Sequence, residues 1–363
     1  MYKNLMAAAC GLLISLLFPH SLAWSAQPLK AAFVYVAPLT ETGWVRQHES
    51  GRQAVEQQLN RQGRAVQTTY VENVPEGPDA ERVIRDLALQ GHRIIFTPSF
   101  GYMEPTLKVA AEFPEVKFES ITGYKRNANV ATANARYYEG RYLAGIAAGR
   151  SSQSGVLGYV AGFPIPEVLQ GSNAFTLGAR SVRPDAEVQV IWLQSWFDPS
   201  RERDAAFTLM NQGADVLAFH TGSSAVMVAA QERGKMAIGY HTDMSRVAPD
   251  AQLLAVTHHW GDYYARRVQA LLDGQWKSGD TWGGVREGMI KIEGFGPRLA
   301  SATRQEVMQR LREMAQGRLI VFKGPIWDAT GKSILAPGLA LNDSQILNMN
   351  FMVQGVRVAA TTP

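Results

Sequence analysis

The sequence has few of the residues that support covalent or metal-based chemistry. It contains one cysteine, Cys10, among 363 residues, so disulfide bonds and cysteine catalysis are excluded once an N-terminal leader is removed. Histidines number only 7, and their spacing does not match a zinc site. His258 and His259 are adjacent, and His48 lacks the second histidine of a zincin motif. We therefore expect no metal ion and no cofactor.

Strong charge and enzyme motifs are missing as well. The formal net charge is +4, and no block of Lys and Arg is interleaved with aromatic residues. A nucleic-acid or membrane-surface partner is not expected from such a pattern. No G-x-S-x-G motif occurs, and the loop after the first predicted strand carries Gly43 alone where a dinucleotide-binding fold needs several glycines. These absences favour a protein that binds a small molecule without changing it.

Long apolar runs are confined to the N-terminus. Lys3 precedes an apolar stretch over residues 5–18, and small residues follow it, so residues 1–25 have the pattern of a signal peptide. No later run reaches the roughly 18 apolar residues that span a membrane. A lipid anchor at Cys10 is not expected, because too few apolar residues precede it. We expect a periplasmic protein without direct membrane insertion after removal of the signal.

The rest of the chain alternates short apolar strands with helical patterns of about a dozen residues, as βαβ units do. The pattern restarts near residue 155 and so predicts an α/β protein of two lobes, each a parallel sheet flanked by helices. The N-terminal lobe is expected to hold residues 27–131 and about 258–285. The C-terminal lobe is expected to hold residues 132–257 and about 286–363, with the position of the last crossing left open. In such a hinged pair, the default ligand site is the cleft between the lobes.

Ligands of open parallel sheets bind beyond the carboxyl ends of the strands, and here those loops are rich in aromatic residues. The candidate ligand-binding residues are Glu41, Thr42, Trp44, Phe100, Tyr102, Phe163, Trp196, His220, His241, Asp243 and Trp260. Trp44 and Trp196 stand at equivalent exits of the two predicted sheets. If they face each other they form a slot for a flat heterocycle, because aromatic stacking adds roughly 0.5–1.5 kcal/mol per pair.

Each candidate also has a structural interpretation. A single ring at a strand exit often caps the sheet and fills the junction between lobes. Asp198 precedes a proline and a helical pattern, so it fits a helix N-cap. His48 and His92 are expected at surface or capping positions. His241 and Asp243 precede no obvious helix, so binding and structural roles both stay open for them.

A series of short motifs runs through the chain in order. They are Glu41-Thr42-Gly43-Trp44, Ser99-Phe100-Gly101-Tyr102-Met103, Tyr138-Glu139-Gly140-Arg141, Phe163-Pro164-Ile165-Pro166-Glu167, Ser195-Trp196-Phe197-Asp198 and Phe322-Lys323-Gly324-Pro325. Together they resemble the basic membrane protein (BMP, PnrA-like) family of substrate-binding proteins. The resemblance implies an extracytoplasmic receptor of an ABC importer, with a type I periplasmic-binding-protein fold and permease subunits as partners. In nucleoside-binding relatives an aromatic ring from each lobe sandwiches the base, and Trp44 and Trp196 stand at the matching motifs.

Two departures from those relatives bear on the ligand. His241 replaces an acidic residue of a Gly-x-Asp-x-Asp stretch, and Trp260 stands near the place of a ribose-contacting lysine. Loss of two charge-assisted hydrogen bonds, each worth roughly 1.5–3 kcal/mol, would weaken ribose binding. We therefore predict a free purine base such as adenine between Trp44 and Trp196, with Trp260 closing the ribose space. The alternatives are a purine nucleoside receptor, an exported purine-metabolising enzyme and a sensory receptor.

Overall fold

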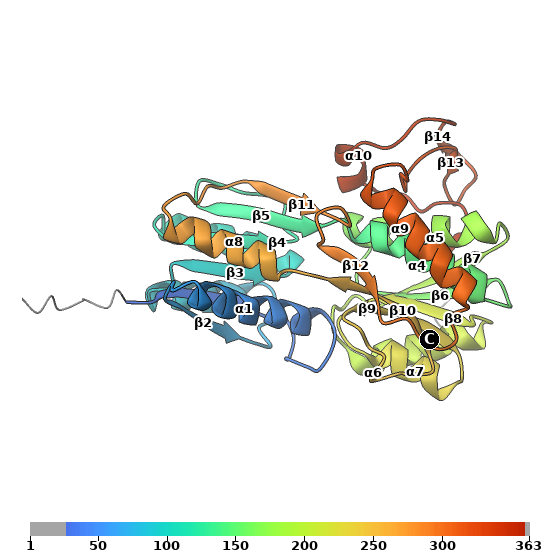
Figure 1. The fold of residues 1–363 in the computed structure, drawn as a ribbon, viewed down its shortest axis with the longest axis horizontal. Coiled ribbons are helices and arrows are strands. Elements are labelled where there is room, and N and C mark those ends of the chain that lie inside the picture. The colour runs from blue at the N-terminus through green and yellow to red at the C-terminus, as the bar shows by residue number, and fades with distance from the viewer. Residues whose placement is uncertain (1–26, 360–363) are drawn as a thin grey trace, which may run out of the picture.

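The protein folds into two lobes, each built on a sheet flanked by helices (Figure 1). The computed structural model describes residues 27–359. It confirms the predicted α/β class and the division into two sheets. The predicted signal peptide and Cys10 lie outside the described residues. Within residues 27–359, no helix combines the length and the apolar character that crossing a membrane requires.

The first sheet is parallel throughout and has the strand order β11-β5-β4-β3-β1-β2. Its strands are β1 (Leu29–Val34), β2 (Val66–Val71), β3 (Ile94–Pro98), β4 (Lys117–Ile121), β5 (Val130–Ala135) and β11 (Asp280–Gly283). Its helices are α1 (Trp44–Arg61), α2 (Pro78–Leu89), the 3-10 helix η1 (Phe100–Tyr102), α3 (Met103–Glu112) and α8 (Gly261–Leu272). The central strands are apolar on both sides because helices cover both faces of a parallel sheet.

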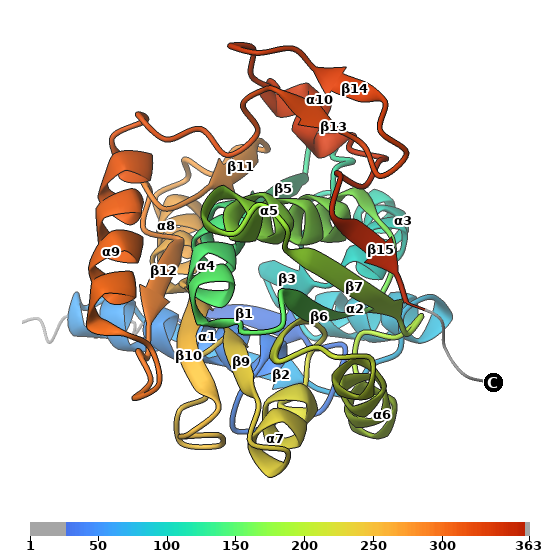
Figure 2. The same cartoon turned by 90° about the vertical axis from the view of Figure 1, so that its right-hand side faces the viewer.

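The second sheet has the strand order β12-β10-β9-β8-β6-β7-β15, and only the β10–β12 pair is antiparallel. Its strands are β6 (Val156–Ala161), β7 (Glu187–Trp192), β8 (Val216–His220), β9 (Met236–His241), β10 (Gln252–His258), β12 (Ile290–Glu293) and β15 (Val356–Val358). Its helices are α4 (Tyr137–Ser151), α5 (Pro166–Val182), α6 (Pro199–Asn211), α7 (Ala225–Glu232) and α9 (Ser301–Ala315). Figure 2 shows α4 and α5 on one face of this sheet and α6 and α7 on the other.

The chain passes between the two sheets after β5, after β10 and after β11. The predicted boundary after residue 131 falls inside β5, and all of β5 belongs to the first sheet, where it pairs with β4 and β11. The first crossing therefore follows residue 135. Arg136 joins two of the crossings, because its backbone N–H donates to the carbonyl oxygen of Gly283 at 2.8 Å. Its guanidinium also lies 3.9 Å from the centroid of the Trp282 ring.

A C-terminal extension follows α9. β13 (Ile326–Trp327) pairs antiparallel with β14 (Ser333–Leu335), and α10 (Asp343–Leu347) follows. Asp343 accepts hydrogen bonds from both terminal nitrogens of Arg136, at 3.0 and 2.7 Å. β15 then returns to the second sheet and pairs with β7 at its edge. The extension is thus attached both to a crossing segment and to the sheet.

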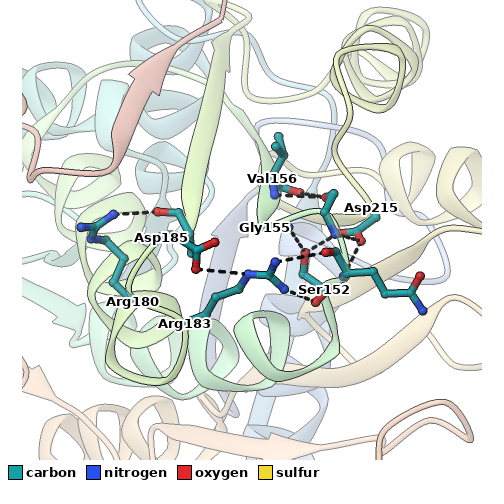
Figure 3. A network of polar contacts seen from close by, with 10 residues as sticks. Ser152, Gly155, Val156, Arg180, Arg183, Asp185 and Asp215 are labelled. Carbon is teal, nitrogen blue, oxygen red and sulfur yellow. Dashed lines mark hydrogen bonds and ion pairs between the residues drawn. The ribbon is translucent and has the colours of Figure 1, made fainter.

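A polar network fixes the end of the second sheet at which β6 and β8 begin (Figure 3). Asp215 accepts a hydrogen bond from Ser152 Oγ at 2.6 Å. It also accepts from the backbone N–H groups of Gln153 and Ser154 at 2.7 and 2.9 Å. Arg183 donates to the carbonyl oxygen of Ser152 at 2.6 Å. Because the carboxyl ends of these strands lie at the other end of the sheet, the network stabilises the scaffold without entering the ligand cleft.

Candidate ligand-binding site

A cavity lies between the lobes, at the carboxyl ends of the strands of both sheets. The space inside it, together with its open mouth, is about 550 Å³. Trp44, Ser99 and Thr122 line it from the first lobe, and Glu167, Trp196 and His220 line it from the second. Among the described residues that line it, Glu167 is the one acidic side chain, and there is no lysine or arginine. The cavity is therefore a mostly apolar slot with one carboxylate.

Two tryptophans from opposite lobes are held in place on the walls of this cavity. Trp44 begins α1, and its Nε1 donates to the carbonyl oxygen of Pro98 at 2.9 Å, which fixes the indole against the end of β3. Trp196 follows β7, and its ring centroid lies 4.7 Å from that of Phe163. Gly162 leaves room for the second indole, because a Cβ there would lie 2.8 Å from Trp196 Cε3. Both indoles are half-buried and both contribute to the cavity lining.

Glu167 supplies the charged polar group of the cavity. It lies in the first turn of α5, where a carboxylate is favoured by the helix dipole. Its Oε2 accepts a hydrogen bond from Asn134 Nδ2 at 2.8 Å, and its Oε1 lies 3.4 Å from His220 Nε2. Its side chain is 12% exposed. The two partners hold the carboxylate in one orientation, with Oε1 available to a ligand that carries N–H or O–H donors.

Two neutral imidazoles line the second-lobe side. Burial lowers the pKa of His220, and the nearby charge of Arg141 lowers it further, although Glu167 acts in the opposite direction. Burial likewise lowers the pKa of His241 well below its usual range, with His220 and Arg141 adding to the effect. At neutral pH both rings are therefore uncharged. Both nitrogens of His241 contact other groups of the protein and His220 Nδ1 is buried, so this wall carries no charge toward a ligand.

Strained backbone surrounds the same region. Asn73, Thr122, Gln194 and His241 have φ values of 56°, 66°, 54° and 67°, in the left-handed region that non-glycine residues rarely adopt. Each of them follows or ends a strand, and Thr122 and His241 line the cavity. Asn73 and Gln194 line a groove that continues from it. Such strain persists where surrounding structure enforces it, and it is concentrated at binding sites.

The two lobes touch at the mouth of the cavity. The backbone N–H of Gly43, in the first lobe, donates to Thr242 Oγ1 of the second lobe at 3.0 Å. Gly43 has φ +93°, and a Cβ built on it would lie 2.1 Å from the carbonyl oxygen of Gly222. Only glycine fits this close approach. The structure is therefore a closed form, in which the loops after β1 and β8 are in contact.

The structure brings five of the predicted site residues together. Trp44, Phe100, Trp196, His220 and His241 all line the cavity. Phe163 lies behind Trp196 and lines the neighbouring groove instead.

Glu41 and Thr42, at the mouth, do not line the cavity. Glu41 is exposed, and Thr42 is buried with its carbonyl oxygen accepting from Thr40 Oγ1 at 2.7 Å.

Two further predicted residues have internal roles, which corrects the prediction. The hydroxyl of Tyr102 donates to the carbonyl oxygen of Val74 within the first lobe, at 2.5 Å. Asp243 Oδ1 accepts from the backbone N–H of Ser245 at 2.9 Å and from Gln252 Nε2 at 2.7 Å. Both side chains are thus used to hold loops, and neither lines the cavity.

The predicted role of Trp260 is also corrected. Trp260 is 1% exposed and stacks on Tyr264, with ring centroids 5.8 Å apart, so it does not close a ribose space. The expectation of a surface or capping position for His48 is wrong. His48 is fully buried, with its Nδ1 2.5 Å from Tyr264 Oη, and its ring lies 4.2 Å from that of Trp44. The His48 ring contacts both Trp44 and Trp260, so these two buried side chains support the Trp44 indole.

Two structural interpretations hold. Asp198 caps α6, because its Oδ1 accepts from the backbone N–H of Arg201 at 3.0 Å. His92 Nδ1 donates to the carbonyl oxygen of Leu87 at 2.8 Å in the last turn of α2.

Sequence reasoning missed Glu167 and Thr122. Glu167 lies in a motif that follows β6, so the rule that ligands bind at strand exits could have identified it as a candidate. Over residues 27–359, no group of three or more side chains is placed to hold a metal ion.

Comparison with known proteins identifies the family of the chain that forms this cavity. A family model described as Bmp, ABC transporter substrate-binding protein PnrA-like, matches residues 29–322. The chain belongs to this family. As an ABC substrate-binding protein it is extracytoplasmic, with a small-molecule ligand and transporter permease subunits as its partners.

This substrate-binding protein has relatives with different named ligands. It is 46% identical over 332 residues to a purine-binding protein of Brucella abortus, covering 91% of this chain and 93% of the relative. It is 34% identical over 309 residues to a Haloferax volcanii protein named as a candidate ABC transporter glucose-binding protein, covering 85% and 78%. A nucleoside-binding ABC transporter protein of Lactococcus lactis is 26% identical over 129 residues, covering 35% and 37%.

Solved structures agree on the fold. A solute-binding protein of an ABC transporter from Aeropyrum pernix matches this substrate-binding protein with a TM-score of 0.67 at 17% identity, covering 85% of this chain and 95% of that one. A transcriptional activator from Bacillus halodurans matches with a TM-score of 0.64 at 21% identity, covering 79% and 98%. These likenesses show a type I periplasmic-binding-protein fold.

Proposed function

We propose that the protein binds a purine base between Trp44 and Trp196 and passes it unchanged to its permease. The observation that carries this proposal is that the two tryptophans line one cavity from opposite lobes. A flat ring that enters between them gains roughly 0.5–1.5 kcal/mol from each aromatic contact beyond the area it buries, whereas a puckered sugar ring gains less from two aromatic side chains. The name of the Brucella relative supports the same class of ligand.

The polar edge of the cavity favours a base with N–H donors. Glu167 accepts hydrogen bonds only, and its Oε1 has no closer partner than His220 Nε2 at 3.4 Å. Two other polar atoms of the lining already have partners: Trp44 Nε1 donates to Pro98, and Thr122 Oγ1 donates to the carbonyl oxygen of Ile121 at 2.6 Å. Adenine presents an exocyclic amine and a ring N–H, so we take adenine as the first ligand to test.

A purine nucleoside is the second candidate. The same carboxylate would accept hydrogen bonds from ribose hydroxyls, and the Lactococcus relative is named as nucleoside-binding. Against it, the lining offers no lysine or arginine beside Glu167 to hold a ribose. Trp260 does not exclude a ribose, because its side chain is 1% exposed and lies against the His48 ring, with ring centroids 5.2 Å apart.

Ligand capture would proceed by closure of the lobes. The chain passes between the sheets at three places, after residues 135, 258 and 283, so the lobes are joined by narrow connections suited to a hinge. The contact between Gly43 and the Thr242 hydroxyl belongs to the closed form. A ligand that touches both tryptophans would stabilise that form, because it makes its full contacts only when the lobes are together.

The proposal is tested by calorimetry and thermal melting with adenine, hypoxanthine, guanine, adenosine and glucose. Adenine at about 100 times its Kd should add about 2.7 kcal/mol of stability, visible as a rise in Tm. Trp44→Ala and Trp196→Ala should each abolish most of that rise. Trp327→Ala is the control, because Trp327 is 43% exposed and lies in the C-terminal extension. Chromatography of the incubated ligand should recover it unchanged.

Four results would contradict the proposal. Stabilisation by glucose alone would show that the ligand is not a purine. Normal binding by both tryptophan variants would show that the ligand does not bind between Trp44 and Trp196. Turnover of any purine would make the protein an enzyme. Binding of adenosine but not of adenine would show that the ligand is a nucleoside and not a free base.

A further inference from the structure

Two of the three connections between the lobes meet at Arg136. This residue follows β5, and its backbone N–H donates to the carbonyl oxygen of Gly283, the last residue of β11, at 2.8 Å. Opening and closing of the lobes changes the backbone angles at such connections. Any group that is bonded to Arg136 is therefore bonded to the hinge itself.

The side chain of Arg136 joins parts of both lobes. On the first-lobe side, its Cζ lies 3.9 Å from the centroid of the Trp282 ring, and its Nε donates to the carbonyl oxygen of Trp282 at 3.3 Å. Trp282 belongs to β11 of the first sheet. On the second-lobe side, Nη1 donates to the hydroxyl of Tyr138 in α4 at 3.0 Å, and both terminal nitrogens donate to the carboxylate of Asp343. The guanidinium thus lies between the end of a first-lobe strand and the C-terminal extension.

The C-terminal extension is fixed to the second lobe. Gln170 Nε2 of α5 donates to the carbonyl oxygen of Ile346 at 2.8 Å. Asn173, also on α5, donates to the carbonyl oxygen of Phe351 at 2.8 Å and accepts from the backbone N–H of Val353 at 2.9 Å. Both α5 side chains are buried. Figure 2 shows β13, β14 and α10 next to α5, and β15 beside β7. The extension therefore moves with the second lobe.

The contacts of this guanidinium connect two parts that move relative to each other. Trp282 moves with the first lobe and Asp343 with the second. A bidentate carboxylate and a stacked ring each fix the plane of a guanidinium. When the lobes rotate apart, the end of β11 turns relative to α10, so one plane no longer satisfies both partners. Since Gly43 of the first lobe contacts Thr242 of the second in this structure, the complete set of contacts belongs to the closed form.

We propose that the ion pair between Arg136 and Asp343 is a brace through which the C-terminal extension stabilises the closed lobes. The side chain of Arg136 is 21% exposed and that of Asp343 is 64% exposed, and a pair of this kind contributes a modest free energy that salt screens. The brace therefore biases the lobes toward closure and still allows them to open. Its effect on ligand affinity rests on the proposed function, whereas its effect on closure is a property of the ligand-free protein.

The first test measures the distance between the lobes in the ligand-free protein by pulsed electron paramagnetic resonance. Spin labels are attached at Gln90→Cys and Asn211→Cys in a Cys10→Ser background, because both labelled positions are exposed at the ends of α2 and α6. These helix ends precede β3 and β8, so they lie away from the cleft. Asp343→Asn should lower the ratio of closed to open lobes about threefold to fivefold.

Two further variants test whether the ion pair itself is responsible. Glu232→Gln is the matched control, because it removes another bidentate pair, with Arg203 at 2.7 and 2.6 Å, that joins α6 to α7 within the second lobe. Its ratio should equal that of the wild type. Arg136→Gln removes the other half of the brace, and in that background Asp343→Asn should have no further effect. A full effect of Asp343→Asn in that background would show that it acts through α10, and would overturn the proposal.

The second test uses salt and adenine. Raising NaCl from about 0.05 to 0.5 M should lower the closed fraction of the wild type and leave Asp343→Asn nearly unchanged, because the variant lacks the pair that salt screens. The Kd for adenine should rise in the variant in inverse proportion to its closed fraction, since the lobes must close around the ligand. Equal distance distributions in wild type and Asp343→Asn would overturn the proposal. If the distributions differ as expected but the wild type binds no purine, the proposed function fails and the brace stands.

Discussion

At the scale of single residues, the cavity combines two fixed indoles with one fixed carboxylate. Trp44 is held by its hydrogen bond to Pro98 and by His48 and Trp260 beneath it. Glu167 is held by Asn134 and His220. Groups that are already ordered lose little side-chain entropy when a ligand binds, so more of each contact contributes to affinity.

The contribution of the carboxylate can be measured with Glu167→Gln. This change keeps the size of the side chain but replaces a charge-assisted hydrogen bond by a neutral one, so adenine affinity should fall by about 1–2 kcal/mol, a factor of about 5–30. Titration calorimetry at neutral pH gives the Kd. Glu41→Gln is the matched control, because Glu41 is exposed and does not line the cavity. An effect of Glu41→Gln as large as that of Glu167→Gln would contradict the assignment.

Single residues also show what sequence reasoning reaches at this scale. The rule that ligands bind at strand exits located Trp44, Trp196 and His241, because it concerns where loops lie. It misassigned Asp243 and Trp260, because it does not predict where a side chain points. Asp243 turns back on its own loop to Ser245, as Asx turns do. Glu167 escaped notice because an acidic residue in a first helical turn already has an ordinary explanation.

At the scale of elements, β5 illustrates a different difficulty. Residues 127–136 are small and polar, a composition that fits a strand crossing between the lobes, so the predicted boundary lay after residue 131. In the structure β5 is a strand that pairs with β4 on one side and with β11, from a segment about 150 residues later, on the other. Local composition cannot reveal a partner that distant in sequence. Strands β1, β3 and β6 were predictable because their apolar runs need no such knowledge.

The Asp215 network at the start of β6 and β8 gives a prediction for stability against pH. Burial alone would raise the pKa of Asp215, but hydrogen bonds from Ser152 and from the backbone of Ser154 and Gln153 together lower it. A lowered folded-state pKa means that the group stabilises the fold above its ordinary pKa of about 3.9 and that this contribution is lost as pH falls through the folded value. Asp215→Asn should therefore lower Tm at pH 7, and the difference from wild type should vanish in strong acid.

Thermal melts between neutral and acidic pH check this expectation. Asp185→Asn is the control within the same region, since Asp185 is 76% exposed and lies 3.5 Å from Arg183 (Figure 3). Exposed pairs contribute little, so its melting curve should follow the wild type throughout. A constant difference between Asp215→Asn and wild type at every pH would show that the charge of Asp215 is not involved.

At the scale of the whole molecule, two glycines allow closure to be tested apart from backbone strain. Gly43 and Gly77 are both helix N-caps with φ +93°. A Cβ on Gly43 would meet the carbonyl oxygen of Gly222 across the cleft at 2.1 Å, whereas a Cβ on Gly77 would have nothing within 4 Å. Gly43→Ala and Gly77→Ala should both lose about 1–3 kcal/mol of stability from strain. Only Gly43→Ala should also weaken adenine binding.

Small-angle X-ray scattering supplies the second measurement. Adenine should reduce the radius of gyration of the wild type and of Gly77→Ala, and it should not do so for Gly43→Ala. Compaction of Gly43→Ala by adenine to the same extent as wild type would mean that the lobes close without the approach of Gly43 to Gly222.

The last strand has a consequence for how the chain behaves in a crowded solution. The family match ends at residue 322, yet β15 lies beyond it and pairs along β7 with Val356 to Val358 opposite Val188 to Val190. Without β15, that margin would present a row of vacant amide and carbonyl groups to any passing polypeptide, the usual starting point of aggregation. β15, which lies beyond the residues matched by the family model, therefore covers the edge of β7 and leaves only its own three residues at the margin of the sheet.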